Sequence, residues 1–375
     1  MLAVGFWGPV GLWLMIHRGA LTVLASVQVD GHRRVPCVTV VIPARNEERN
    51  LQRALQSVLA LDYPDLEIVV INDRSTDGTG HILARMAEGD PRITVLTGED
   101  PPTGWLGKPY ALHTGAQRAR GEFILFTDAD IVFHPLALRK AMAHLQANGL
   151  DHVTVVPEDT MPGVFLKVFS ATFGMFLFMV FAPWNARNPK SRRFMGIGAF
   201  QLIRASVYRA LGGHQRVALR PDEDLKFGKL VKGHGYRQDV MDGNGMVAVE
   251  WYRSVSELRD GLMKNMFAGM DYSVWLALLA TGASLVLHLW PWVGVWVADG
   301  WPRALYAATV VMMVGSFGFT MGPWGARYWH GLLLPFTIGM LVYVQCRAMV
   351  LTLWQGGIVW RGRFYALALL RKNRV

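Results

Sequence analysis

The stretch Phe123-Ile124-Leu125-Phe126-Thr127-Asp128-Ala129-Asp130 decides the fold prediction. Four consecutive apolar residues followed by a polar edge are typical of a buried parallel strand that leads into a cleft. In open α/β sheets ligands bind beyond the carboxyl ends of the strands, where Asp128 and Asp130 are expected to lie. Residues two apart in an extended chain point the same way, so both carboxylates are expected to face one ion. So few hard oxygen ligands favour Mg²⁺ or Mn²⁺, with phosphates and water completing the shell.

A bare Asp-x-Asp is short and common, so the alternative is that both side chains cap a helix or line a solvated loop. Three further polar clusters at expected element ends favour a site: Pro43-Ala44-Arg45-Asn46-Glu47, Asn72-Asp73, and Pro221-Asp222-Glu223-Asp224. The alternative for the last cluster is helix N-capping with compensation of the dipole. No glycine-rich phosphate-binding motif follows the first strand, so a metal and basic residues are expected to hold phosphates.

Strand and helix patterns alternate over the first half of the chain. Apolar runs at 38–42, 66–71, 93–96, 123–126 and 153–156 predict strands, and amphipathic or capped segments between them predict helices. Asn46 is expected to cap the helix after the first strand. This alternation predicts a largely parallel, doubly wound α/β sheet.

Composition narrows the class of protein. The chain has 375 residues, 52% of them hydrophobic, and 14 tryptophans, with the apolar excess at both ends, which predicts membrane segments. The net charge of +10 suits nucleic acid, anionic lipid or a phosphorylated substrate. Neither zinc-finger spacing nor a basic-aromatic RNA signature accompanies it, so lipid and nucleotide are favoured over nucleic acid. Cys37 and Cys346 fit free thiols in a reducing compartment.

These patterns predict four regions. Residues 1–28 form an N-terminal membrane anchor or interfacial helix, with Arg18, Arg33 and Arg34 on its cytoplasmic side. Residues 36–270 form the catalytic domain. Residues 272–356 form C-terminal transmembrane helices, with apolar stretches at 272–297, 305–321 and 332–354. Residues 357–375 form a basic tail.

The aromatic segment 164–182 is expected to lie in the membrane interface, with a buried core helix as the alternative. Positive residues keep the tail on the cytoplasmic face with the catalytic domain, which requires an even number of crossings. The three C-terminal apolar stretches would give an odd number of crossings, which conflicts with this requirement. Either one of them is interfacial, or one splits, for instance at His288 to Pro291.

The order of the motifs resembles that of the family 2 glycosyltransferases. Val-Val-Ile-Pro-Ala-Arg-Asn-Glu, Asn-Asp-Arg-Ser-Thr-Asp-Gly-Thr, Asp-Ala-Asp and Glu223-Asp224 carry this resemblance, from about Val38 to Gly269. Gly104-Trp105-Leu106-Gly107-Lys108, Gly212-Gly213-His214, Lys264-Asn265 and Trp360-Arg361-Gly362-Arg363-Phe364-Tyr365 are similar to a membrane-bound bacterial branch with carotenoid (staphyloxanthin-type), hopanoid and ceramide glycosyltransferases. The resemblance implies a GT-A fold, a Rossmann-like nucleotide-diphospho-sugar transferase domain, joined to transmembrane or interfacial helices.

The resemblance also implies roles. Asp224, beside Glu223, would be the general base that deprotonates the acceptor. Like charge from Glu223 and Asp222 is expected to raise the pKa of Asp224. Asp128 and Asp130 would bind Mn²⁺ or Mg²⁺ at the donor diphosphate. The remaining donor-binding residues would be Pro43, Ala44, Arg45, Glu47, Asp73 and Lys108, and the acceptor-side residues Gly198, His214 and Lys264.

One departure concerns the motif Gln-x-x-Arg-Trp, which many family members carry after the Glu-Asp pair. Here the corresponding place reads Gly261-Leu262-Met263-Lys264-Asn265, which disfavours a chain-extending synthase. The predicted function is an inverting, metal-dependent transfer of one sugar from a nucleotide sugar, expected to be UDP-linked, to a lipid. The expected location is the bacterial cytoplasmic (inner) membrane, multi-pass, with the catalytic domain facing the cytoplasm. The alternatives are a processive polysaccharide synthase and a non-catalytic membrane subunit that keeps the fold.

Overall fold

The computed structural model describes residues 2–30 and 34–375, so Met1 and Arg33, assigned above to the anchor and its basic flank, lie outside the described residues. The chain divides into two compact units. An α/β unit contains Leu21–Glu158 and Pro183–Glu250, and a helical unit contains the chain up to Ala20, Asp159–Ala182 and Trp251–Arg374. The segments around 164–182 and 251–266 therefore group by their contacts with the apolar helices.

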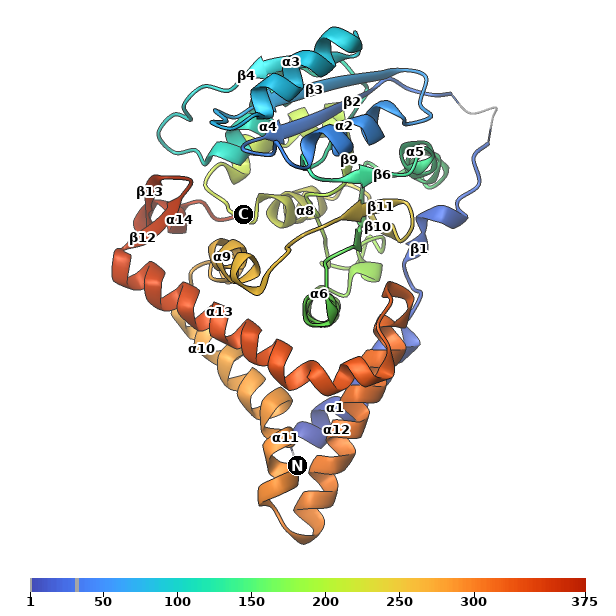
Figure 1. Cartoon of the computed structure of the whole chain (residues 1–375). Coiled ribbons are helices and arrows are strands. Elements are labelled where there is room, and N and C mark those ends of the chain that lie inside the picture. Colours follow the sequence, from blue (N-terminus) through green and yellow to red (C-terminus); the bar gives the residue numbers. More distant parts are fainter. Residues whose placement is uncertain (1, 31–33) are drawn as a thin grey trace. The chain divides into compact units, whose positions relative to one another are not determined.

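The α/β unit is built on an eight-stranded sheet among the described residues, in the order β1-β10-β7-β9-β5-β2-β3-β4 (Figure 1). The strands are β1 (Thr22–Val23), β2 (Val38–Ala44), β3 (Leu66–Asn72), β4 (Ile93–Thr97), β5 (Phe123–Phe126), β7 (His152–Val156), β9 (Gln201–Arg204) and β10 (Gln238–Asp242). All pairs are parallel except those of β9, which runs antiparallel to both β5 and β7. The predicted α/β sheet is confirmed, and its antiparallel strand is a feature that the sequence pattern did not predict.

The register of β2, β3 and β5 brings their carboxyl ends to one edge of the sheet. Ala44 pairs with Asn72, and Val41 pairs with Phe126. Because β9 runs the opposite way, its first residue, Gln201, pairs with Phe126 at this same edge. The loop before β9 therefore joins the loops after β2, β3 and β5.

Helices cover both faces of the sheet because successive strand residues point to opposite sides. Val40 and Ile42 belong to one buried cluster, and Val41 between them belongs to the other. The first cluster includes residues of α2 (Leu51–Leu59), α3 (Thr79–Gly89) and α5 (Ala137–Ala147), and the second includes residues of α4 (Gly107–Arg118), α7 (Ala205–Ala210) and α8 (Glu223–Gly233). Shorter elements complete the unit: the 3₁₀ turns Leu24–Ser26, Pro183–Asn185 and Gly213–Val217, and a small sheet of β6 (Val132–Phe133), β11 (Val247–Val249) and β8 (Glu158–Asp159).

The prediction that Asn46 caps the helix after β2 is wrong. Helix α2 begins at Leu51, and Asn46 has a left-handed backbone with φ 56°. Its Oδ1 accepts a hydrogen bond from the backbone N–H of Thr76, 2.8 Å away. Asn46 therefore ties the loop after β2 to the loop after β3.

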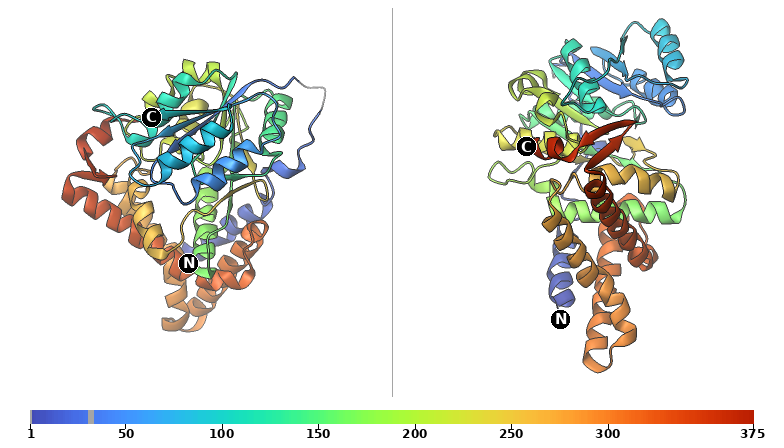
Figure 2. Two further views of the ribbon diagram at one scale, coloured as in Figure 1. Left: turned by 45° about the horizontal axis from the view of Figure 1, so that its top comes forward. Right: turned by 90° about the vertical axis from the view of Figure 1, so that its left-hand side faces the viewer.

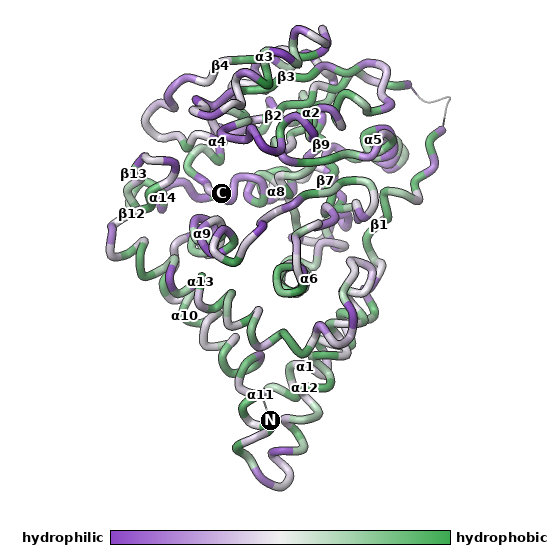
Figure 3. Tube along the Cα trace, in the orientation of Figure 1, coloured by the Kyte–Doolittle hydropathy of each residue, from purple (hydrophilic) through white to green (hydrophobic). Residues whose placement is uncertain are grey.

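The helical unit contains long apolar helices. Its elements are α1 (Leu2–Ile16), α6 (Val164–Phe181), α9 (Val255–Met266), α10 (Val274–Ala283), a π-helical segment (Ser284–Leu289), α11 (Trp290–Val297), α12 (Gly300–Met321), the 3₁₀ turns Gly322–Trp324 and Tyr328–Leu333, α13 (Leu334–Gln355), β12 (Gly357–Trp360), β13 (Arg363–Ala366) and α14 (Leu367–Lys372). Figure 2 shows α11 and α12 as a helical hairpin, and Figure 3 shows the hydrophobic character of α6, α10, α11, α12 and α13.

Four helical stretches of the described chain are long and apolar enough to cross a membrane: Val164–Asn185, Val274–Val297, Gly300–Trp324 and Tyr328–Gln355. The last three coincide with the stretches predicted from the sequence, and α1 is shorter. The first meets the same criteria as the other three, so the interfacial placement of 164–182 stays a prediction.

The suggested split at His288 to Pro291 does not occur. Helix α10 continues through the π-helical segment into α11, with Pro291 in the first turn of α11. Proline lacks the N–H that an α-helix uses, and a wider turn just before it accommodates the ring without breaking the helix.

Candidate active site

The predicted donor residues at the ends of β2 and β3 come together. The backbone N–H of Asp73 donates to the carbonyl of Ala44 at 2.7 Å, and an Arg45 guanidinium nitrogen lies 3.8 Å from Asp73 Oδ2. The N–H of Glu47 donates to Thr79 Oγ1 at 2.8 Å, which joins the two loops again. These contacts hold the loops after β2 and β3 together, so their polar residues lie at one edge of the sheet, as the sequence predicted.

Asp73 is the buried centre of this group. It is 4% exposed, and Arg74 Nε donates to its Oδ1 at 2.9 Å. Pro43 is half-buried, whereas Ala44 is fully buried in the core, so only the backbone of Ala44 is available to a ligand.

Lys108 joins two of the predicted catalytic elements. It lies in the first turn of α4, and its Nζ is 2.6 Å from Asp128 Oδ1 and 3.0 Å from Glu223 Oε1. Burial opposes a positive charge here, but Asp128, Glu223 and Asp224 outweigh it and hold the pKa of Lys108 well above its usual value. Lys108 is therefore a cation bound between a strand-end carboxylate and the start of α8.

Asp224 is held by backbone N–H groups on both oxygens. Gly198 N–H donates to its Oδ2 at 2.8 Å, and Leu225 N–H donates to its Oδ1 at 2.8 Å. The pKa of Asp224 is raised, chiefly because the carboxyl is buried and further by the charge of Asp128, while Lys108 and the two N–H groups oppose the rise. The geometry gives an oriented carboxylate that is easier to protonate than a free aspartate.

The predicted rise of the Asp224 pKa is confirmed in direction, but like charge, the predicted cause, is not the leading one. Asp222 is paired with Arg220, whose Nε and Nη2 each lie 2.8 Å from one of its oxygens. Arg220 is 1% exposed, so this pair is part of the packed interior. Burial rather than the neighbouring Asp222 is the leading cause, and the Arg220 partnership was not predicted from the sequence.

Asp128 and Asp130 follow β5 as predicted, although not as an extended segment. Strand β5 ends at Phe126, and Ala129 and Asp130 form a turn. The pKa of Asp130 is raised to about 7, first by burial and then by the charges of Asp128 and Glu47. The two aspartates thus interact through a turn rather than through the alternation of a strand.

These carboxylates suit a divalent cation. Asp128 and Asp130 are half-buried. Carboxylates that repel one another are stabilised by a metal ion, and carboxylates are preferred ligands of Mg²⁺ and Mn²⁺. No group of three or more His, Cys, Asp or Glu side chains positioned to hold a metal occurs among residues 2–30 and 34–375. Asp128 and Asp130 would therefore hold an ion only together with oxygens of a ligand and water.

A position beside Gly198 shows how closely the charged groups converge. A methyl group placed on its Cα would lie 2.8 Å from Asp128 Oδ2, 3.2 Å from Lys108 Nζ and 3.4 Å from Asp224 Oδ2. Gly198, predicted above on the acceptor side, therefore lies where three charged side chains come close together and leave no room for a side chain. Its neighbour Gly196 packs so tightly on α8 that a methyl group there would overlap the carbonyl of Asp224.

The other two predicted acceptor-side residues have surroundings of their own. His214 is 2% exposed, stacks on Phe227 with ring centroids 5.2 Å apart, and shares a 2.8 Å hydrogen bond with the hydroxyl of Tyr208. Burial, followed by the charges of His113 and Lys108, lowers the pKa of His214 to about 3, so it is neutral. Lys264 belongs to the helical unit, where its Nζ lies 4.5 Å from the ring centroid of Trp360.

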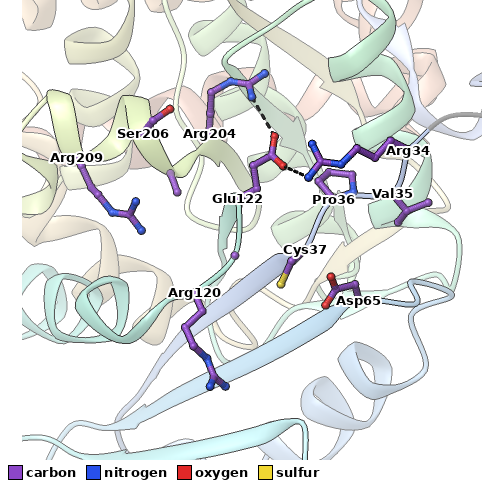
Figure 4. Close-up of a pocket in the computed structure, with 12 residues that line it drawn as sticks. Arg34, Val35, Pro36, Cys37, Asp65, Arg120, Glu122, Arg204, Ser206 and Arg209 are labelled. Atoms are coloured by element: carbon purple, nitrogen blue, oxygen red, sulfur yellow. Dashed lines mark hydrogen bonds and ion pairs between the residues drawn. The ribbon is translucent and has the colours of Figure 1, made fainter.

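A separate cavity of about 520 Å³ lies at the opposite edge of the sheet (Figure 4). Its lining includes residues just before β2, β3 and β5, among them Cys37, Asp65 and Glu122. Glu122 pairs there with Arg34 at 2.9 Å and with Arg204 at 3.4 Å. None of the predicted catalytic or donor-binding residues lines this cavity, so it is not the candidate active site.

Comparisons with known proteins identify the family of a domain in this chain. Residues 39–212 match Glycosyl transferase family 2. The chain is 26% identical over 234 residues to the 4,4'-diaponeurosporenoate glycosyltransferases of Staphylococcus aureus strains USA300 and NCTC 8325, covering 62% of this chain. It spans 61% of the length of these relatives.

A solved structure shows the same fold. A mannosyltransferase from Pyrobaculum calidifontis, in complex with GDP-Man and Mn²⁺, aligns with a TM-score of 0.51 and 19% sequence identity, over 93% of this chain and 99% of that one. The predicted family and fold class are thereby confirmed. This chain carries a family 2 glycosyltransferase domain with the GT-A fold.

Proposed function

We propose that this protein is an inverting, metal-dependent glycosyltransferase that moves one sugar from a nucleotide sugar to a lipid acceptor. The observation that carries the proposal is the convergence of Asp128, Lys108 and Asp224 on Gly198. A metal-ligand candidate, a cation suited to phosphate and a base candidate meet there within the dimensions of one reacting group.

The residues divide into donor and acceptor roles. Asp73, Arg45 and Glu47 hold the nucleoside end of the donor, and Lys108 binds its diphosphate. Asp128 and Asp130 would hold a divalent cation, which when bound would supply positive charge to the departing diphosphate. UDP-sugars are the expected donors, and the GDP-Man complex of the structural relative makes GDP-sugars the second class to test.

Asp224 removes the proton from the acceptor oxygen as that oxygen attacks the anomeric carbon. The hydrogen bonds from Gly198 and Leu225 fix the direction of its carboxylate. A buried carboxylate with a raised pKa is a stronger base than a free one, which suits proton removal near neutral pH. A single displacement opposite the leaving nucleotide inverts the anomeric configuration.

The lipid acceptor and the location rest on the helical unit and on the relatives. Four stretches of the described chain are long and apolar enough to span a membrane. The relatives at 26% identity are named for a diaponeurosporenoate acceptor. The arginines and lysine of the 357–375 tail favour the cytoplasmic face of a bacterial inner membrane for the α/β unit.

The test is donor hydrolysis by the purified full-length chain in detergent, with Mn²⁺ or Mg²⁺, across a panel of UDP- and GDP-sugars. We expect slow release of one nucleotide, abolished in Asp130→Ala. Asp62→Asn, which removes an exposed carboxylate paired with Arg139 at 2.7 Å, is the matched control and should hydrolyse like the wild type.

Adding a lipid extract and analysing the products distinguishes the alternatives. One sugar per lipid supports the proposal, and a growing polymer identifies a processive synthase instead. If no nucleotide sugar is hydrolysed or bound in a metal-dependent manner, the domain is a non-catalytic binding platform.

A further inference from the structure

Lys108 already neutralises the carboxylate that the proposed function assigns to a metal. Its Nζ contacts Asp128 Oδ1 at 2.6 Å while also contacting Glu223 Oε1 at 3.0 Å. The Glu223 side chain is 3% exposed and that of Lys108 is 24% exposed. The Asp128 side chain is 36% exposed, so its contact is partly screened by water, whereas the Glu223 contact is shielded. With two short charge-assisted contacts, Lys108 is a resident cation of this group.

The second oxygen of Asp128 lies beside Gly198, where the Lys108 ammonium also comes close. A methyl group on Gly198 would lie 2.8 Å from Asp128 Oδ2 and 3.2 Å from Lys108 Nζ. A divalent ion bound to Asp128 would therefore lie within a few ångströms of the Lys108 ammonium. Like charges at such a distance repel strongly where water is scarce, so the two cations compete for one carboxylate.

A nucleoside diphosphate resolves this competition. Its phosphate oxygens give the ammonium a new partner and give the metal additional ligands, so both cations are stabilised together. Glu223 keeps Lys108 close to Asp128 while the exchange occurs, because it holds the same ammonium from the start of α8.

We propose that Lys108 is an internal counter-cation that excludes free divalent metal from Asp128 and Asp130 until a nucleoside diphosphate takes over its ammonium. The proposal rests on the proposed function, because it concerns the metal and the diphosphate of that same site. Metal and nucleotide then bind as a pair, and after transfer the return of Lys108 to Asp128 expels both. A lysine that only contacts the diphosphate would have no effect on metal in the absence of nucleotide.

The test measures Mn²⁺ binding to the full-length chain in detergent by electron paramagnetic resonance, first with Mn²⁺ alone and then with UDP or GDP. In Lys108→Met we expect Mn²⁺ alone to bind about tenfold more tightly than in the wild type. We expect nucleoside diphosphate at saturating Mn²⁺ to bind about tenfold more weakly. Lys108→Arg keeps the charge and should bind Mn²⁺ alone like the wild type.

Two further variants control for misfolding and for binding of Mn²⁺ at another site. Lys108→Met leaves the buried Glu223 without its partner, so Lys108→Met/Glu223→Gln removes both charges and keeps the measurement possible if the single variant does not fold. Asp128→Asn should abolish Mn²⁺ binding in either background, which shows that the measured ion is the one at this site.

The outcomes separate the inference from the proposed function. Unchanged or weaker binding of Mn²⁺ alone to Lys108→Met and to the double variant, with nucleotide-dependent Mn²⁺ binding intact in the wild type, overturns the inference and leaves the transferase standing. No Mn²⁺ binding to the wild type with any nucleotide overturns both.

Discussion

The backbone N–H of Gly198 lies 2.8 Å from Oδ2 of Asp224, so a residue without a side chain orients the proposed base. The relationship depends on the antiparallel strand β9, whose start lies at the carboxyl edge of β5 and brings the preceding loop to the site. Gly198 has no positive φ, so the absence of its side chain is required by space and not by backbone conformation.

Gly198→Ala is expected to reduce turnover by roughly a hundredfold, because its methyl group would lie 2.8 Å from Asp128 Oδ2 and displace that carboxylate from its position beside Lys108. The melting temperature should stay near that of the wild type. Steady-state kinetics and thermal unfolding check this. Gly89→Ala, at a helix end with no atom within 4 Å of the added carbon, is the matched control. Equal kinetics for the two variants would contradict the assignment of the site.

The rate of transfer should fall on the acidic side at a higher pH than that at which a free aspartate is protonated. Asp224 acts when ionised, and burial raises its pKa, so activity is lost as the pH falls through that raised value. The profile of kcat/KM against pH from 4 to 9 measures this loss of activity at low pH, the acidic limb of the profile. In Asp224→Asn the rate should drop by about 10²- to 10⁴-fold and the residual activity should lose this limb. A limb that persists in the variant would assign the base to another residue.

Glu223→Gln should raise the melting temperature at pH 8, and by less at pH 5. Burial, with a further contribution from Asp224, raises the pKa of Glu223 to about 7 despite Lys108, so the folded state binds a proton more readily than the unfolded state. Stability from this group is therefore present at low pH and is lost as the pH rises from 4.5 towards 7. Differential scanning fluorimetry at both pH values measures it.

Glu67→Gln is the control of opposite sign. Burial raises the pKa of Glu67, but hydrogen bonds from Thr39 and Arg120 outweigh it and lower the pKa overall. The ionised form is thus the stabilising one, and removing it should lower the melting temperature at both pH 5 and pH 8. The same direction of change in both variants would refute the electrostatic explanation.

Gln345→Leu is expected to destabilise the helical unit by about 1 kcal/mol, because the side chain joins α13 to α10. Its Nε2 donates to the carbonyl of Ala277 at 2.9 Å and to Thr281 Oγ1 at 2.8 Å. Thermal unfolding in detergent measures the loss. Gln355→Leu, at an exposed position on the same helix, should leave the unfolding temperature unchanged, and a similar loss in both variants would argue against the interhelical bonds.

The residues after strands were predictable because parallel strands end at one edge of a sheet. Asp73, Asp128 and Asp130 follow β3 and β5 as expected, and Lys108 and Asp224 open helices beside them. The Gly196-x-Gly198 loop was harder to place because it precedes a strand, and no local pattern shows that β9 runs antiparallel. The only available signal was the pair of glycines before an apolar strand. The partnership of Asp222 with Arg220 also escaped prediction, because three adjacent carboxylates look alike until their partners are known.

The chain passes between the two units at residues 20/21, 158/159, 182/183 and 250/251, so neither unit is a continuous piece of sequence. During synthesis, α6 emerges before β9 and β10, yet the sheet needs both strands for its central order. When the apolar helix α6 leaves the ribosome, strands β2 to β7 have already been synthesised. Strands β5 and β7 still lack β9, which lies between them in the finished sheet. The sheet can therefore be completed only after this apolar helix has been synthesised, so an unfinished sheet and an exposed apolar segment exist side by side on the growing chain.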